Sequence, residues 1–505
     1  PNQSPKLGET VKLRIRINEA IGRVTEVRVR FSESGEAFPS EKAKVWKRQG
    51  RWTWYEATIT IHNPKMNYRF YIKLASGSVL WYNTQGLSVL NQPDVLDFRL
   101  NTFSSAPAWG KKAIMYQIFP DRFARSTKAD AHKTPKWAIA KNWGDEVIGS
   151  GPGTSEQFFG GDLWGVIEKL DHLQSLGVNL LYLTPIFPAR SNHRYDASSF
   201  HKVDPLLGGD KAFAALIKEA HKRGMKVMGD LTSNHSGVGH EWFKAAYKKP
   251  KALESEFYYF SEKNTKYDSW FGVPSLPKFN WNSKELRKRF IQGPKSVVAH
   301  WLKKPFNMDG WRIDVANMTG RIRDEDLYLE VAQVIRKTMV KENPDTLMLG
   351  EYTGDAAYEV QGDGWQGAMT YSNFTKPVWR WFYNKNVKGD PGFMMWDGDY
   401  VADGVDLVTS YNQFIAAFPW HVRLHNMNPL DTHDIPRFKT FAIKGAQQVA
   451  AVMQFTFPGI PVIWAGDEFG LDGVNGENSR TPMPWNNERE HDPSMLPIYQ
   501  QLTRL

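Results

Sequence analysis

Four short apolar runs of this chain each end in a cluster that contains an acidic residue, and two of the clusters also contain a histidine. The clusters fall at residues 229–235, 310–318, 349–352 and 430–434, and they contribute Asp230, Asp314, Glu351 and Asp434. A single Asp or Glu at such a place is most simply a cap or a solvated charge. Four clusters at matching places indicate one site that the fold assembles.

Carboxylates arranged in this way can cleave an acetal. That reaction needs an acid to protonate the leaving oxygen and a carboxylate to meet the oxocarbenium-like centre. Arg312 and Asp314 are two residues apart on one predicted strand, so they point to the same side, and the guanidinium favours the ionised Asp that a nucleophile requires. Glu351 can act first as acid and then as base, and His235 and His433 are neutral donors suited to sugar hydroxyls. The spacing alone also fits a metal-dependent barrel hydrolase.

The elements that would position these clusters alternate between short strands and amphipathic helices from residue 113 onward. Helices are expected at 163–176 and at 211–223, the second with a possible cap at Asp210. Eight βα units predict an α/β fold of the (β/α)8 TIM barrel type, with catalytic groups at the carboxyl ends of the strands. The expected strands are Ala113–Phe119, Val178–Ile186, Lys226–Leu231, Gly310–Val315, Leu347–Glu351, Ala368–Tyr371, Met427–Thr432 and Ile460–Ala465.

Two further regions are expected around the barrel strands. Residues 1–105 show period-2 alternation at 11–17, 24–31, 52–61 and 68–74, which predicts an N-terminal antiparallel β-sandwich. The catalytic barrel would then span 106–505. The segment after the third strand is too long for a loop and predicts an insertion domain at about 236–300, beside the active-site face.

Composition and charge exclude several functions. A chain of 505 residues is longer than one hydrophobic core usually organises, so at least two domains are expected. The net charge of +10 is concentrated in residues 1–105, where basic residues alternate with apolar ones as on a solvated strand face, so no nucleic-acid partner is expected. No window approaches 18 apolar residues, so no membrane span is expected. The absence of cysteine excludes disulfides and zinc–thiolate sites. The first residues, Pro-Asn-Gln-Ser-Pro, leave export open, with the cytoplasm favoured.

The four clusters resemble the conserved regions of the α-amylase superfamily, glycoside hydrolase family 13. Supporting motifs are Tyr116-Gln-Ile-Phe-Pro-Asp-Arg-Phe123, Gly160-Gly-Asp-Leu163 and Gly466-Asp-Glu468. The resemblance covers roughly residues 113–485. It implies a retaining α-glucoside hydrolase with Asp314 as nucleophile, Glu351 as general acid/base and Asp434 as transition-state stabiliser. Substrate-binding positions that it implies are Tyr195, Asp230, His235, Arg312 and His433. Arg437 is also expected to bind substrate.

One segment resembles a particular subfamily of this superfamily. Leu276-Pro-Lys-Phe-Asn280 is similar to the Met-Pro-Lys-Leu-Asn signature of neopullulanases, cyclomaltodextrinases and maltogenic amylases. This implies hydrolysis of α-1,4 bonds in maltooligosaccharides, cyclodextrins or pullulan, and a starch-binding-type N-terminal domain through which a homodimer is possible. An exo-acting maltodextrin glucosidase, a transglycosylase and an amylase-like binding scaffold without activity are the alternatives.

The remaining expectations concern particular residues. Trp270 and Phe271 are expected to border the acceptor side, unless they only pack the core of the insertion. Met318 stands where the subfamily usually has Glu, and in this it resembles maltodextrin glucosidases. Between residues 121 and 135 the only carboxylates are Asp121 and Asp130, so neither calcium nor another cofactor is expected. The C-terminal β-domain usual in the family is expected to be missing.

Overall fold

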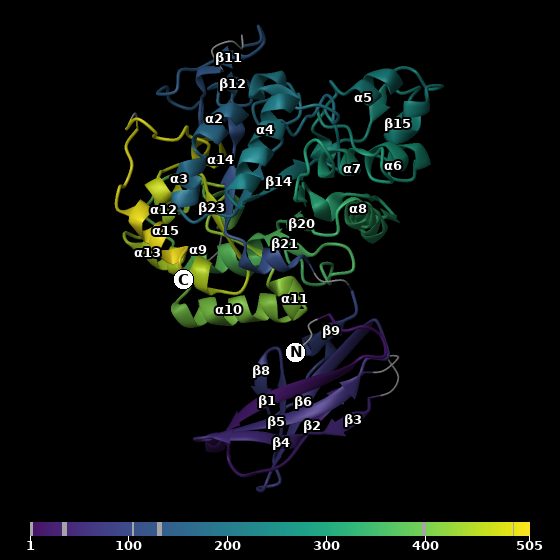
Figure 1. Cartoon of the computed structure of the whole chain (residues 1–505), viewed down its shortest axis with the longest axis vertical. Helices are drawn as coiled ribbons and strands as arrows, with labels where there is room; N and C mark the ends of the chain where they lie inside the picture. The colour runs from purple at the N-terminus through teal and green to yellow at the C-terminus, as the bar shows by residue number, and fades with distance from the viewer. Residues whose placement is uncertain (1–3, 33–37, 104–105, 129–133, 396–399, 488) are drawn as a thin grey trace.

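A computed structural model describes residues 4–32, 38–103, 106–128, 134–395, 400–487 and 489–505. Figure 1 shows a β domain at the N-terminus, drawn in purple, below a larger barrel that contains the rest of the chain. The domain boundary expected at residue 105 falls on residues 104–105, which lie outside the described residues.

The N-terminal domain consists of two antiparallel sheets. One has the strand order β1-β5-β4, and the other has the order β3-β2-β6-β7-β8 with β9 paired to β6. The strands are β1 (Thr10–Asn18), β2 (Val24–Phe31), β3 (Ser40–Lys42), β4 (Lys44–Gln49), β5 (Trp52–Thr60), β6 (Lys65–Leu74), β7 (Val79–Asn83), β8 (Gly86–Ser88) and β9 (Phe98–Asn101).

The alternation of side chains explains this sandwich. In β1 the apolar Val11, Leu13, Ile15 and Ile17 are buried, whereas the basic residues between them face solvent. They share one core with apolar residues of β2, β5 and β6, so the two sheets pack face to face. The predicted β-sandwich is therefore confirmed. Strand β4 was not predicted because all of its residues are exposed and it lacks alternation.

The rest of the chain is built around a closed barrel of eight parallel strands, as predicted. Each strand lies within or close to its predicted range. The barrel strands, in order around the barrel, are β10 (Met115–Ile118), β13 (Leu180–Leu183), β14 (Lys226–Leu231), β17 (Gly310–Ile313), β20 (Leu347–Tyr352), β21 (Gly367–Thr370), β22 (Met427–Pro429) and β23 (Ile460–Trp464).

Strand register explains why distant clusters meet. Asp230 at the end of β14 is paired with Arg312 in β17, and Arg312 is paired with Leu349 in β20. Side chains two residues apart on a strand share a face. Asp314 and Glu351 therefore extend beyond Arg312 and Leu349 at the same rim of the barrel.

The helices cover the outside of the barrel, and two differ from expectation. The helix expected at 163–176 is two helices, α2 and α3, broken at Lys169 (φ −106°, ψ 6°). Asp210 lies inside α4, whose N-cap is Gly208, and its carboxylate accepts from the Val203 N–H instead. The helices are α1 (Pro120–Phe123), α2 (Leu163–Glu168), α3 (Leu170–Ser175), α4 (Gly209–Lys222), α5 (Glu241–Ala246), α6 (Lys284–Phe290), α7 (Val297–Leu302), α8 (Tyr328–Glu342), α9 (Lys376–Phe382), α10 (Gly404–Ala416), α11 (Trp420–Arg423), α12 (Phe438–Phe441), α13 (Ala446–Thr456), α14 (Gly476–Ser479) and α15 (Met495–Leu502).

The long segment between β14 and β17 holds α5, α6, α7 and the strand pair β15 (Phe260–Ser261) and β16 (Lys266–Tyr267). In Figure 1 its α5, β15 and α6 lie at the upper right, beside the barrel. Short strand pairs elsewhere are β11 (Ile139–Ala140) with β12 (Gln157–Phe158) and β18 (Arg321–Ile322) with β19 (Glu325–Asp326). In the described part of the chain, no helix has the length and apolar character to cross a membrane.

Candidate active site

A cavity of about 650 Å³ opens at the rim where the barrel strands end. Asp314 and Glu351 line it from the ends of β17 and β20, and Asp434 lines it from the loop after β22. Tyr195 and Trp270 line it from the segments after β13 and β14. Its volume is in the range usual for small-molecule sites.

Arg312 connects three carboxylates beneath this cavity. The residue is fully buried, and its Nη1 donates to Oδ1 of Asp230 at 2.9 Å and to Oδ1 of Asp314 at 3.0 Å. Its Nη2 lies 2.9 Å from Oε2 of Glu351. Buried charges are tolerated only when they are paired and hydrogen-bonded. This one guanidinium therefore holds the ends of β14, β17 and β20 in a fixed relation.

Asp314 presents one carboxylate oxygen that the protein does not use. Its Oδ1 accepts from Arg312, whereas Oδ2 has no hydrogen-bond partner among the described residues. The next residue, Val315, has φ 45° and ψ 45°, a conformation rare for a β-branched side chain. Its N–H donates to Oε2 of Glu351 at 2.9 Å. Backbone strain of this kind is typical of functional sites.

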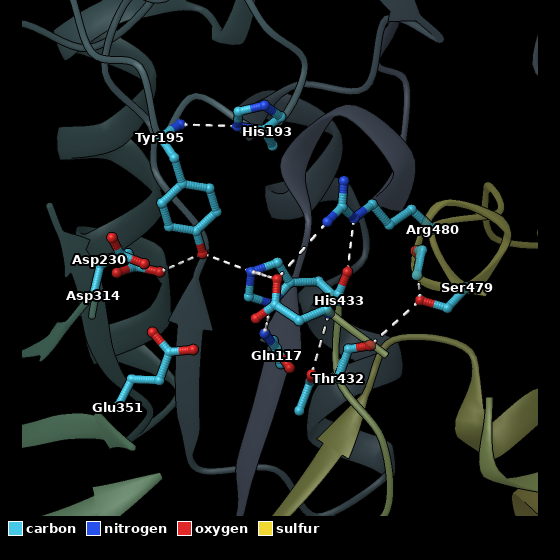
Figure 2. A network of polar contacts seen from close by, with 12 residues as sticks. Gln117, His193, Tyr195, Asp230, Asp314, Glu351, Thr432, His433, Ser479 and Arg480 are labelled. Atoms are coloured by element: carbon cyan, nitrogen blue, oxygen red, sulfur yellow. Dashed lines mark hydrogen bonds and ion pairs between the residues drawn. The ribbon is translucent and has the colours of Figure 1, made fainter. Parts of the chain in front are cut away.

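Tyr195 is held beside these carboxylates by its hydroxyl group (Figure 2). The hydroxyl donates to Oδ2 of Asp230 at 2.9 Å and lies 2.6 Å from Nε2 of His433. The same Nε2 is 3.2 Å from Oδ1 of Asp434, and Nδ1 of His433 is 2.6 Å from Nε2 of Gln117. The chain of contacts fixes Tyr195 in the cavity wall, whereas Asp230 and His433 are buried behind it and do not line the cavity.

Burial dominates the electrostatics of the cavity. It raises the pKa of Asp314, an effect that Arg312 opposes and that the charge of Glu351 reinforces. Burial also raises the pKa of Glu351 and of Asp434, and Arg312 and Arg480 respectively oppose it. Neighbouring carboxyl groups of this kind titrate as a coupled set. The carboxyl groups of the cavity therefore retain a proton at a higher pH than exposed carboxyl groups would.

The insertion contributes one of its two predicted aromatic residues. Trp270 lines the cavity, and its ring centroid is 5.9 Å from that of His235. Phe271 does not line the cavity: its side chain is 76% exposed and its ring packs on Trp270 at 5.1 Å. His235 lines the cavity too, and burial lowers its pKa to about 3. It is therefore neutral.

Arg437, which we expected to bind substrate, lies away from the cavity. It is buried, donates to Oδ1 of Asp467 at 2.8 Å, and also donates to the carbonyl oxygen of Ser479 at 2.9 Å. These contacts use its donors within the protein. The structure therefore places Arg437 as a bridge between two loops.

The cavity is also lined by residues that were not predicted as site residues from the sequence, among them Glu477, Arg480 and Phe393. Arg480 donates from Nε to the carbonyl oxygen of His433 at 2.7 Å (Figure 2). Its Nη1 is 2.9 Å from Oε1 of Glu477. Its Nη2 lies 3.8 Å from Oδ1 of Asp434. These residues lie in or beside short helical turns, where no periodicity in the sequence marks them.

In the loop at residues 121–135, the carboxylate of Asp121 already has hydrogen-bond partners within the protein. Both carboxylate oxygens of Asp121 accept the N–H of Phe159, and Oδ2 also accepts from Nε of Arg122 at 2.8 Å. Asp130 lies outside the described residues. Among the described residues, no group of three or more His, Asp or Glu is arranged to hold a metal ion.

Two family profiles match the chain. The profile described as the α-amylase catalytic domain matches residues 117–501, and the α-amylase N-terminal ig-like domain matches residues 7–103. The first begins within β10 and includes the other seven barrel strands and every residue of the candidate site.

Individual relatives match over most of the chain. A cyclomaltodextrinase of a Bacillus species is 32% identical over 410 residues, which are 79% of this chain and 66% of the relative. Neopullulanase 2 of Thermoactinomyces vulgaris is 28% identical over 514 residues, covering 98% of this chain and 81% of the relative. Among solved structures, a cyclomaltodextrinase aligns over 100% of this chain and 83% of its own, with a TM-score of 0.72 and 26% identity.

Proposed function

The chain belongs to the α-amylase family, and we propose that it is a retaining glycoside hydrolase that cleaves α-1,4-glucosidic bonds in maltooligosaccharides, cyclodextrins or pullulan-type α-glucans. The relatives named cyclomaltodextrinase and neopullulanase support this substrate range. The observation that carries the proposal is the cluster of Asp314, Glu351 and Asp434 around one cavity, with Arg312 pairing the first two.

The reaction proceeds in two displacements. Asp314 attacks the anomeric carbon through Oδ2, the oxygen without a partner among the described residues, while Glu351 gives its proton to the leaving glycosidic oxygen. The glucosyl–Asp314 ester forms and the acetal bond breaks. Glu351 then takes a proton from water, which attacks the ester and releases the sugar with its original anomeric configuration.

The protonation states follow from the contacts of each group. Asp314 must be ionised, and the Nη1 contact from Arg312 at 3.0 Å supports that form. Glu351 must begin protonated. Its burial and the negative charge of Asp434 raise its pKa, against the opposing effect of Arg312. We infer that the proton retained by the cavity resides on Glu351.

The other cavity residues bind and orient the sugar. Tyr195 offers an aromatic ring to the reacting glucose. His433, which is neutral because burial lowers its pKa, lies behind Tyr195 and holds its hydroxyl group. Asp434 stabilises the positive charge that develops on the sugar ring. Trp270 borders the acceptor side, with Phe271 beside it as an exposed extension.

We also propose a domain assignment for the chain. Residues 1–105 form a starch-binding-type domain, residues 106–505 form the catalytic barrel, and about 236–300 form its insertion. A homodimer through the N-terminal domain is part of this proposal. Sedimentation velocity of the chain would test it, and a monomer at micromolar concentration would contradict it.

Product analysis tests the proposed activity. The protein is incubated separately with β-cyclodextrin, pullulan, panose and maltotriose, and the products are separated by chromatography. We expect linear maltooligosaccharides from the ring and α-1,4 cleavage of the linear substrates, with Asp314→Asn as an inactive control. Release of glucose alone from chain ends would favour an exo-acting glucosidase, and no product from any of the four would refute the proposal.

A further inference from the structure

Lys278 places an ammonium group behind the wall of the cavity. Its side chain is buried, and residues 277–279 pair in antiparallel fashion with residues 234–236 at the end of β14. The ammonium donates to Oδ1 of Asn234 and, at 2.9 Å, to the carbonyl oxygen of Met318. Among the described residues, no carboxylate forms an ion pair with it. Its position is therefore set by these two acceptors.

The ammonium determines which way the amide of Asn234 faces. An ammonium group has three donors and no acceptor, so the amide must present its oxygen to Lys278. The amide nitrogen is then the atom that faces the neighbouring imidazole. Nδ2 of Asn234 lies 3.1 Å from Nδ1 of His235. The contact with the ammonium therefore assigns the oxygen and nitrogen of the Asn234 amide, which are otherwise hard to tell apart.

The orientation of the amide in turn fixes the imidazole. Because Nδ2 of Asn234 donates, Nδ1 of His235 must accept, and the ring proton is on Nε2. This Nε2 is buried and has no hydrogen-bond partner among the described residues, although His235 lines the cavity. A buried donor without a partner is costly. A ligand acceptor that reaches His235 would satisfy it.

We propose that Lys278 is a positioning residue that, through Asn234, holds His235 in the Nε2–H tautomer and so makes it a hydrogen-bond donor to the substrate. The tautomer follows from the protein alone. The identity of the acceptor, a hydroxyl group of an α-glucan, rests on the proposed function. Lys278 also holds the Met318 carbonyl, so the same ammonium connects the loops that follow β14 and β17.

The arrangement depends on the charge of Lys278. Burial lowers its pKa to about 8, while the charge of Asp268 opposes that effect. His235 is the other titratable group that faces it, and the ammonium helps to keep that imidazole neutral. A neutral amine can accept as well as donate, so above this pH the amide of Asn234 is no longer held in one orientation.

The tautomer is measured by long-range ¹H–¹⁵N correlation spectra of the deuterated, histidine-labelled protein, with His235→Gln to assign the signals. Wild type should show His235 as the Nε2–H form. Lys278→Met should show a mixture or the Nδ1–H form. Lys226→Met is the matched control, because Lys226 lies at the opposite end of β14 and pairs with Asp309 at 3.0 Å. It should leave the His235 signals unchanged.

Kinetics provide a second readout. Lys278→Met should lower kcat/KM about tenfold, the loss expected for one hydrogen bond. Wild-type kcat/KM should fall above pH 8, and Lys278→Arg should move that fall to higher pH because a guanidinium stays charged. An Nδ1–H form in wild type would overturn the proposal, as would a Lys278→Met variant with unchanged tautomer and kcat/KM. Failure of the proposed function would instead appear as no glucan hydrolysis by wild type, whatever the tautomer.

Discussion

Replacement of Arg312 by methionine should destabilise the protein in a strongly pH-dependent way. The wild-type guanidinium contacts Asp230, Asp314 and Glu351 at 2.9–3.0 Å, and it is fully buried. Removal of one partner from a buried ion pair costs about 3–5 kcal/mol. Since three carboxyl groups lose the same cation at once, we expect the upper end of this range at pH 7.

The sign of the pH dependence follows from the carboxyl groups left behind. Without the cation their folded-state pKa values rise further above the ordinary 3.8 of Asp and 4.5 of Glu. The folded variant then binds more protons than the unfolded chain, so its stability increases as the pH falls through the raised values. The difference in free energy of unfolding between wild type and Arg312→Met should fall to roughly half of its pH 7 value near pH 5.

The assay is urea unfolding of wild type and Arg312→Met at pH 7 and pH 5, followed by tryptophan fluorescence. Arg194→Met is the control, because Arg194 is also buried but its Nε pairs with a single carboxylate, Asp204, at 2.8 Å. The loss in free energy of unfolding of Arg194→Met should change less between the two pH values. If Arg312→Met loses the same free energy of unfolding at pH 7 and at pH 5, the electrostatic reasoning is refuted.

Three further predictions concern ligands and substrates. Tyr195→Ala should lower kcat/KM roughly 100-fold, or about 2.7 kcal/mol, with little change in Tm, and a variant that loses stability but keeps its activity would refute the stacking role. Exhaustive EDTA treatment should leave activity and Tm unchanged, because the Asp121 carboxylate is already occupied by Arg122 and backbone N–H groups; a loss that Ca²⁺ restores and Mg²⁺ does not would contradict this. Met318 offers only a soft apolar contact to an acceptor sugar, so maltotriose incubations should yield few α-1,6-branched products by chromatography, and abundant branching would overturn that expectation.

The barrel could be predicted from the sequence because its strands are buried on both faces and alternate with amphipathic helices. The carboxylates of the site could be located because each lies at the end of such a strand or in the loop that follows it. Lys169 breaks a helix without a proline or glycine to signal it. Arg480 and Phe393 reach the cavity from short helical turns after β23 and β21, where side-chain direction depends on tertiary contacts. The same holds for Arg437, whose partners Asp467 and Ser479 come from short helical segments beyond the last barrel strand.

The central claim is that Asp314 is the nucleophile of a retaining double displacement. Proton NMR of the first products, recorded before mutarotation, tests it most directly. The account predicts that the α-anomer appears first, and that Asp314→Asn and Glu351→Gln lose several orders of magnitude in turnover while they remain folded. Early release of the β-anomer would contradict the account, because it would mean that water and not Asp314 attacks the anomeric carbon.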